Sequence, residues 1–366
     1  CPVYSNTKIV TNVTISGNSA ANGGGLILTS SAGFGPHPTL TNVTISGNVA
    51  NGSGGGIWYD GAGSNPPPLT NVTISGNTAS WEGGGMYLTG DSPTLTNVTF
   101  SGNSCTLGGG MFLDYSASPT MTSVTFSGNT AYHAGGGMYL KDSSSPTLTS
   151  VTFSGNTAGH SGGGMYLKDS SSPNLTSVTF SGNTATNNGG GMGLSHSSNP
   201  ILLNSILWGN SPEEIYFDAG NPDSTNLITI AYSDIQGGQD SIATNDNGTV
   251  AWGFGNIDVD PLFVDADNDD FNLTIDSRCI DTGHPDSTDG DGTIADMGAF
   301  YYDQTGQPVR VHNLITTPSA ENVSVKWNTN SDAASYNVYR STDGSADFYS
   351  LNPYTSTWNS SDTSYV

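Results

Sequence analysis

The strongest constraint in this sequence is a segment that recurs between residues 18 and 210. The tripeptide Ser-Gly-Asn, or Trp-Gly-Asn at its last occurrence, returns at steps of 30, 29, 26, 26, 27, 27 and 27 residues. A Gly-Gly-Gly follows each of the first seven copies. A period of this length is typical of stacked architectures in which each unit packs only against its neighbours. The tripeptides end at Asn18, Asn48, Asn77, Asn103, Asn129, Asn156, Asn183 and Asn210.

Apolar residues alternate with polar ones inside each repeat. Val98 and Phe100 flank Thr99, and alternation of this kind indicates short strands with one buried face. The sequence therefore predicts an all-β chain that begins with a right-handed parallel β-helix, a solenoid with coils of about 27 residues. At the usual interstrand spacing of about 4.8 Å, the seven steps would span about 34 Å.

Equivalent residues of successive coils are then expected to lie above one another in columns. The asparagines that end the tripeptides should turn inward and form a hydrogen-bonded ladder, because buried amides are costly without partners. The glycine triplets suit tight corners, since glycine adopts backbone angles closed to other residues. Three apolar columns should fill the core: Val13, Val43, Val72, Val98, Val124, Val151 and Val178; Ile15, Ile45, Ile74, Phe100, Phe126, Phe153 and Phe180; Met86, Met111, Met138, Met165 and Met192.

Two motifs of the repeat carry a resemblance to a known group of proteins. Phe-Ser-Gly-Asn (residues 100–103) and Gly-Gly-Gly-Met (residues 108–111) resemble the paired F-x-x-N and G-G-A-[ILV] repeats of the polymorphic outer-membrane proteins. Those proteins are β-helical surface adhesins, so the resemblance implies a surface role. Glycine stands here where that repeat has alanine.

The segment from residue 256 to 302 is similar to the carboxy-terminal end of bacterial choice-of-anchor Q proteins. The D-P-x-F, S-P-C-I-D-x-G and D-x-G-A-x-E/Y motifs correspond to residues 260–263, 277–283 and 296–301, with Arg278 in place of proline. The resemblance implies an exported, surface-attached protein and brings no established catalytic residues.

The composition changes after residue 304. The remaining segment resembles the first half of a fibronectin type III domain, with Trp327 as core tryptophan and residues 336–339 as the next strand. A complete module needs about 90 to 100 residues, so this one is partial. We therefore expect a β-helix over residues 1–303, regular to 210 and degenerate with an acidic end over 211–303, and a partial fibronectin type III-like β-sandwich over 304–366.

Charge excludes several function classes. Seven Lys and Arg residues face 31 Asp and Glu residues, a net charge of −24. Nucleic acids and anionic membranes require clustered cations, so neither is an expected partner, and no apolar run is long enough for membrane insertion. A surface rich in Ser, Thr, Asn and Gly favours an extracellular, secreted or cell-surface location. Asn-X-Ser/Thr sequons suggest glycosylation at Asn12, Asn42, Asn71, Asn97, Asn174, Asn247 and Asn272.

Two outward columns are candidate contact surfaces. A threonine column resembles ice-binding arrays, although stacked threonines also stabilise an exposed strand. The aromatic column is expected to be exposed and to bind sugars or a neighbouring molecule, unless its rings cover one another or a loop covers them. The threonines are Thr14, Thr44, Thr73, Thr99, Thr125, Thr152 and Thr179. The aromatic candidates are Trp58, Tyr87, Phe112, Tyr139 and Tyr166.

Catalytic and metal-binding patterns are weak. The spacing assembles no Ser-His-Asp, Cys-His or paired-carboxylate arrangement, so no catalytic residue is assigned. Cys105 and Cys279 are expected to be small buried residues. Clustered aspartates favour a structural calcium ion, because hard cations take several carboxylate oxygens. The candidate ligands are Asp265, Asp267, Asp269, Asp289, Asp291 and Asp296.

These observations predict a non-enzymatic extracellular structural protein, a β-helical rod for adhesion, display or self-assembly into a filament. Its expected partners are other copies of itself, through head-to-tail or lateral assembly, or glycans of a host surface, and it requires no cofactor. The alternative is a carbohydrate-binding protein or polysaccharide lyase that uses the outward aromatic face.

Overall fold

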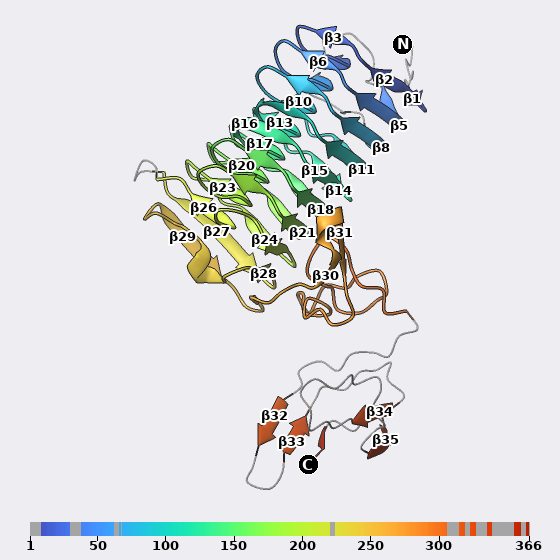
Figure 1. The fold of residues 1–366 in the computed structure, drawn as a ribbon, viewed down its shortest axis with the longest axis vertical. Coiled ribbons are helices and arrows are strands. Elements are labelled where there is room, and N and C mark those ends of the chain that lie inside the picture. The colour runs from blue at the N-terminus through green and yellow to red at the C-terminus, as the bar shows by residue number, and fades with distance from the viewer. Residues whose placement is uncertain are drawn as a thin grey trace, which may run out of the picture. The chain divides into compact units, whose positions relative to one another are not determined.

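The computed structural model describes residues 9–29, 38–61, 66, 68–219 and 224–305, together with the backbone of five short strands beyond them (Figure 1). The chain divides into two compact units, Cys1–Tyr302 and Asp303–Val366. In the second unit, β32 (Ile315–Pro318), β33 (Val323–Lys326) and β36 (Ser364–Tyr365) form one antiparallel sheet. A second pair consists of β34 (Ser335–Val338) and β35 (Thr355–Asn359). Trp327 lies outside the described residues.

Three parallel sheets build the coils of the first unit, and each regular coil contributes to all three, whereas the last coils continue the threonine sheet beyond the end of the short sheet (Figure 1). The threonine sheet consists of β1 (Ile9–Thr11), β2 (Thr14–Ser16), β5 (Thr39–Ser46), β8 (Leu69–Ser75), β11 (Thr94–Ser101), β14 (Thr120–Thr122), β15 (Thr125–Ser127), β18 (Thr147–Ser154), β21 (Asn174–Ser181), β24 (Ile201–Leu203), β25 (Ile206–Trp208), β27 (Asn226–Ala231), β28 (Asp234–Ile235) and β29 (Gly248–Trp252).

Along each regular coil, the chain passes from the threonine sheet into the other two sheets. The short sheet, after the asparagine corner, consists of β3 (Ser19–Ala20), β6 (Val49–Ala50), β9 (Thr78–Ala79), β12 (Ser104–Leu107), β16 (Thr130–Ala134), β19 (Thr157–Ala158) and β22 (Thr184–Ala185). The aromatic sheet, after the glycine corner, consists of β4 (Leu26–Thr29), β7 (Ile57–Asp60), β10 (Met86–Thr89), β13 (Met111–Asp114), β17 (Met138–Leu140), β20 (Met165–Leu167), β23 (Met192–Leu194) and β26 (Ile215–Phe217).

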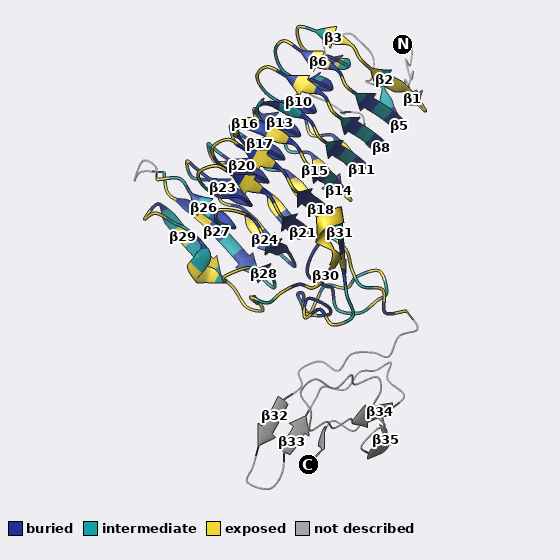
Figure 2. Ribbon diagram, viewed as in Figure 1, coloured by how far each residue is buried: buried dark blue, intermediate teal, exposed yellow. Residues whose placement is uncertain are grey.

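Equivalent residues of neighbouring coils pair directly. Val98 pairs with Val72, and Phe126 lies between Phe100 and Phe153. This register confirms the predicted parallel β-helix. The inward columns form one continuous core, which Figure 2 shows as buried ribbon along the stack. The stacked phenylalanines lie 4.5 to 4.8 Å apart, close to the strand spacing itself.

The inward asparagines form a ladder in which every amide from Asn48 onward is fully used. The Oδ1 of Asn129 accepts hydrogen bonds from the backbone N–H and the Nδ2 of Asn103, at 3.0 and 2.9 Å. Its own Nδ2 donates to Oδ1 of Asn156 and to the carbonyl of Phe100. The side-chain pattern repeats from Asn18 to Asn210. Because each side chain satisfies two rungs, the ladder keeps the coils in register without a cost for buried polar groups.

The glycine corner explains why three glycines recur. Gly135 has a φ of +69°, which favours glycine. A Cβ on the next residue, Gly136, would lie 2.4 Å from the carbonyl oxygen of Gly163 in the following coil. Close contact between coils therefore requires glycine at this corner.

An acidic side chain ends the asparagine ladder. Glu214 takes the place of a further asparagine, and its two carboxylate oxygens accept the backbone N–H and the Nδ2 of Asn210. Glu214 is buried, and burial raises the pKa of its carboxyl group from 4.5 to about 7, against the lowering effect of the hydrogen bonds from Asn210.

The raised pKa predicts that this end of the stack is more stable in mild acid. The folded state binds the proton more tightly than the unfolded state, so this stability is complete below pH 4.5 and is lost as the pH rises towards 7. The titration of Glu214 lowers the free energy of unfolding by at most about 3 kcal/mol between about pH 5 and pH 8. We expect Glu214→Gln to remove this contribution, so that Tm falls less over the same pH range. Thermal unfolding followed by circular dichroism measures it. Asp240→Asn, at an exposed site, is the control, and an unchanged slope in Glu214→Gln would contradict this account.

Beyond the coils, the first unit contains the hairpin of β30 (Phe263–Asp265) and β31 (Asp270–Leu273) and single 3-10 turns at Gln239–Ser241 and Ala266–Asn268. In the part of the chain that the structure describes, no helix is long and apolar enough to cross a membrane.

Candidate functional site

The segment after the last coil returns along the outside of the threonine sheet. We call residues 260–302 the strap. The sequence suggests that this acidic segment ends the β-helix, but the structure places it against the outward face of coils that lie earlier in the chain. The backbone N–H of Ala299 donates to Oγ1 of Thr179 at 2.9 Å, across 120 residues of sequence. Figure 1 shows β30 and β31 beside the threonine sheet.

A change of residue type on the outward face marks where the strap docks. Ile206 continues the threonine column after Thr179, and Trp208 continues the serine column after Ser181. Ile206 is buried in a second apolar core formed with the strap. The other members are Leu273, Cys279, Ile280 and Met297, with Trp208, Ile257, Phe263 and Tyr302 packed around them. The sequence analysis did not identify Ile206 and Trp208 as docking residues. The signal for it was present, because both are apolar residues at outward positions that hold threonine or serine in the earlier coils.

Backbone hydrogen bonds complete the docking. Asn204 has a left-handed backbone, like Ser150 and Ser177 in the same column. Its Oδ1 accepts the N–H of His284, and its carbonyl accepts the N–H of Gly298, both at 2.8 Å. Serine stands at this position in the two preceding coils, whereas the asparagines at this position in four earlier coils bond one another, so the amide of Asn204 strengthens docking but is not unique to the docked coil.

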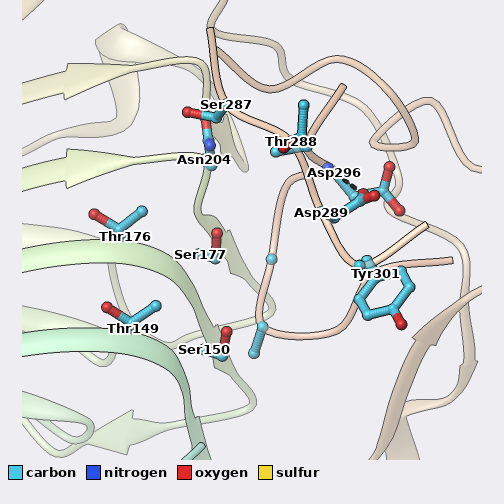
Figure 3. A pocket seen from close by; sticks show the side chains of 14 residues that line it. Thr149, Ser150, Thr176, Ser177, Asn204, Ser287, Thr288, Asp289, Asp296 and Tyr301 are labelled. Atoms are coloured by element: carbon cyan, nitrogen blue, oxygen red, sulfur yellow. Dashed lines mark hydrogen bonds between the residues drawn. The ribbon is translucent and has the colours of Figure 1, made fainter. Parts of the chain in front are cut away.

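A cleft of about 520 Å³ separates the strap from the threonine sheet (Figure 3). Thr149, Ser150, Thr176 and Ser177 line its β-helix side, and Asp289, Asp296 and Tyr301 lie on its strap side. Burial is the main cause that raises the pKa of Asp289 to about 7 and that of Asp296 to about 6. Buried carboxyls in a cleft are a common feature of active sites.

The hydrogen bonds of these carboxylates lie within the strap, which favours a structural role. One oxygen of Asp296 accepts the N–H of Asp281 at 2.7 Å, and the other accepts the N–H of Tyr302 at 2.6 Å. Asp289 accepts the N–H of Asp296, and with Asp291 it accepts the hydroxyl of Thr293. These contacts fold the strap upon itself.

The predicted calcium site is not assembled. Within the described ranges, no three His, Cys, Asp or Glu side chains are placed to hold a metal ion. Asp289 and Asp296 use their oxygens as described above, whereas Asp265 accepts from Nδ2 of Asn268 beside the 3-10 turn. Asp267 and Asp269 line a separate cleft of about 570 Å³ against Trp208. Asp289, Asp291 and Asp296 lie together within the strap, but hydrogen bonds of the strap itself engage their carboxylates.

The outward aromatic column is half-buried at Trp58 and Tyr87 and buried from Phe112 to Tyr166, which corrects the prediction of an exposed face. Tyr87, Phe112 and Tyr139 stack in sequence with centroids 5.6 and 5.0 Å apart. Phe112, Tyr139 and Tyr166 are only 3, 6 and 8% exposed, and they pack against Leu107 and Ala134 of the short sheet. Trp58 is half-buried at the start of the column. The rings cover one another, so their faces are not available to stack on a ligand.

The column ends because the next coil has no side chain there. A Cβ on Gly193 would lie 2.8 Å from the ring of Tyr166, which tilts by 31° relative to Tyr139. The hydroxyl of Tyr166 donates to Asp218. Sequence reasoning did not identify Asp218, since it lies 52 residues away.

A groove of about 350 Å³ lies beside the end of this column. Its bottom includes Tyr139 and Tyr166, and its rim carries His133 and His160. Lys168 also lines it. Elsewhere on the surface, Nζ of Lys141 lies 3.1 Å from the carboxylate of Asp142.

The threonine column is only partly open. Thr44, Thr73, Thr99 and Thr125 are half-buried, while Thr152 and Thr179 are buried where the strap covers them. Any contact of this face with a partner is therefore restricted to the earlier coils.

The sequons lie in three environments. Asn12, Asn42, Asn71 and Asn97 are exposed and form an outer ladder in which each Nδ2 bonds the preceding Oδ1, at 3.0 to 3.3 Å. Asn247 is only 4% exposed and donates to the carbonyl of Asp218, so burial contradicts glycosylation there. Asn174 and Asn272 are exposed, and glycosylation of the exposed sequons stays a prediction.

The pattern of coils agrees with comparison to known proteins. The family described as "Right handed beta helix region" matches residues 24–207 and 122–256, which together cover more than half of the chain. This chain belongs to that family. No curated protein and no solved structure matches it. The family contains both enzymes and non-enzymes, so membership establishes the right-handed β-helix and leaves the activity open.

The second apolar core predicts how the strap can be released. Ile206→Thr with Trp208→Ser restores the hydroxyl pattern of the earlier coils and removes the apolar contact. We expect a loss of about 3 to 5 kcal/mol of docking free energy and faster hydrogen exchange over residues 260–302, while the coils before β21 keep their protection.

Hydrogen exchange with mass spectrometry measures both regions in one experiment. Leu203→Thr is the matched control, because it restores the same consensus on the same coil outside the second core. Protection of the strap that is equal in the double variant and the control would show that Ile206 and Trp208 do not hold it.

Proposed function

We propose that this chain is a non-enzymatic structural protein of the cell surface or extracellular space, a β-helical rod that serves adhesion, display or self-assembly. The single observation that supports it most is the unbroken column of hydrogen-bonded asparagines from Asn18 to Asn210. Each rung repeats the same internal contacts, so the number of rungs sets length without changing the structure of any rung. The uncharged polar surface and the scarcity of cations support an extracellular location.

The two resemblances are part of this proposal. The choice-of-anchor Q-like motifs, at residues 260–263, 277–283 and 296–301, all fall within the strap, which suits a closing element of a surface β-helix. The polymorphic outer-membrane protein-like motifs provide the asparagine and glycine corners. The paired antiparallel strands between residues 315 and 365 are compatible with a fibronectin type III-like module. Such a module would serve as a spacer or attachment point.

Removal of one whole coil tests the role of a spacer. Deletion of residues 130–156 joins Asn129 to Thr157 and keeps the sequence of the corner, because the rungs at Asn129 and Asn156 are equivalent. We expect a cooperatively folded protein whose stack is shorter by about 4.8 Å, with unchanged surface attachment or assembly. Small-angle scattering and binding to the producing cell measure the two properties.

Deletion of half a coil, residues 130–142, is the control, since it breaks every column and should prevent folding. Loss of attachment and assembly in a well-folded one-coil deletion would contradict a spacer role. For self-assembly in particular, size-exclusion chromatography showing only monomers of the intact secreted protein at all concentrations would count against it.

Carbohydrate binding is the second candidate, and the groove beside the aromatic column favours it. Trp81 is 63% exposed and Tyr132 is 81% exposed on the loops of the same side, so their ring faces are open to sugars. Glycan-array binding should fall by about tenfold or more in Trp81→Ala and Tyr132→Ala, since stacking on one ring contributes about 1.5 kcal/mol. Tyr115→Ala, at an exposed tyrosine on another corner, is the control. Unsaturated sugar products that absorb in the ultraviolet would instead establish a polysaccharide lyase.

A further inference from the structure

Two histidines occupy the same position on neighbouring rungs at the rim of the groove. The backbone N–H of His160 donates to the carbonyl of His133 at 2.7 Å, and their neighbours Ala134 and Ser161 form a parallel bridge. The imidazole rings are stacked, with centroids 5.1 Å apart and planes inclined by 13°. Both side chains are exposed. This is the one place in the described chain where two imidazoles stack on consecutive coils.

A buried hydroxyl orients one of these rings. Nδ1 of His160 lies 3.0 Å from Oγ of Ser161, and Ser161 is buried. When Nδ1–H donates to this oxygen, Nε2 carries the lone pair and points away from the backbone. Metal-binding histidines commonly have such an oxygen acceptor on the second nitrogen, because it sets the tautomer and raises ligand basicity.

We propose that His133 and His160 together bind a divalent transition-metal ion of the zinc or nickel class. Ions of this class prefer imidazole nitrogen, and an ion about 2.1 Å from each nitrogen requires the nitrogens to be within about 4 Å of each other. In the stacked pair the in-plane lone pairs run side by side, so the rings must open from 13° to roughly a right angle before both nitrogens point at one ion, and exposed side chains make such rotations. Water completes the coordination. The net charge of −24 attracts cations to the protein as a whole.

The site differs from the calcium site expected at the carboxy-terminal aspartates in both place and chemistry. It uses nitrogen ligands on the short-sheet side, whereas the strap lies on the threonine sheet. It is also independent of the proposed structural function. A bound ion would join two adjacent coils through their side chains and would place a positive charge at the rim of the groove.

Isothermal titration calorimetry with zinc chloride at near-neutral pH tests the proposal. The whole chain is first treated with a chelator, and excess calcium is kept in the buffer to occupy carboxylate sites. We expect one zinc ion per chain, and a loss of affinity of more than about tenfold in His133→Asn and in His160→Asn. Asparagine is the residue that follows in this column, at position 187, so these variants should fold. Ser161→Ala should weaken binding by about tenfold by removing the acceptor.

His196→Asn is the matched control, because His196 is exposed on another corner and has a left-handed backbone that asparagine tolerates. A second measurement reports location directly: nickel should broaden the imidazole NMR signals of His133 and His160 before those of His196 and His284. The proposal is overturned if the wild-type chain binds no zinc, or if both asparagine variants bind it as the wild type does. Broadening centred on His196 or His284 would also overturn it.

Discussion

The hydrogen bond from one asparagine to the next keeps the coils in register, and the rest of the structure depends on that register. Each Oδ1 accepts two donors from the preceding rung, so a shift of one residue would leave several buried polar groups without partners. In this register, equivalent residues of successive coils stack on one another. Valine, phenylalanine and methionine columns fill the core, and glycines stand at the corner where neighbouring backbones come closest. A chain with few large apolar residues can therefore build a continuous core.

The outward face is controlled by a different rule. While threonine and serine continue in their columns, the face stays polar and partly open. Where Ile206 and Trp208 replace them, the face becomes apolar and the strap covers it. Asn204 adds hydrogen bonds at the same coil. Two apolar substitutions within three residues of a repeat, with Asn204 beside them, thus convert a free surface into a binding surface for the chain's own carboxy-terminal segment.

The inward columns could be predicted from the sequence because they depend on contacts between neighbouring repeats, and the period states which residues are neighbours. The outward features could not. Tyr139 and Tyr166 were expected to be exposed, since alternation indicates the direction of a side chain but not what covers it. Their burial depends on Leu107 and Ala134 of the adjacent sheet, and the tilt of Tyr166 depends on Gly193. The strap depends on pairings across 80 and 120 residues, which no local pattern reports.

The asparagine ladder also has a direction. Between side chains, each asparagine donates to the next one on the carboxy-terminal side and accepts from the one before it, and the last, Asn210, donates to the carboxylate of Glu214. A carboxylate has no N–H to pass on, so the series ends there. Genetic duplication of a coil before Asn210 would leave this terminus intact, whereas a coil added after Glu214 would begin without its donor. A coil inside the stack can therefore be repeated without disturbing its end, and the nearly identical residues 124–140 and 151–167 are two such equivalent coils.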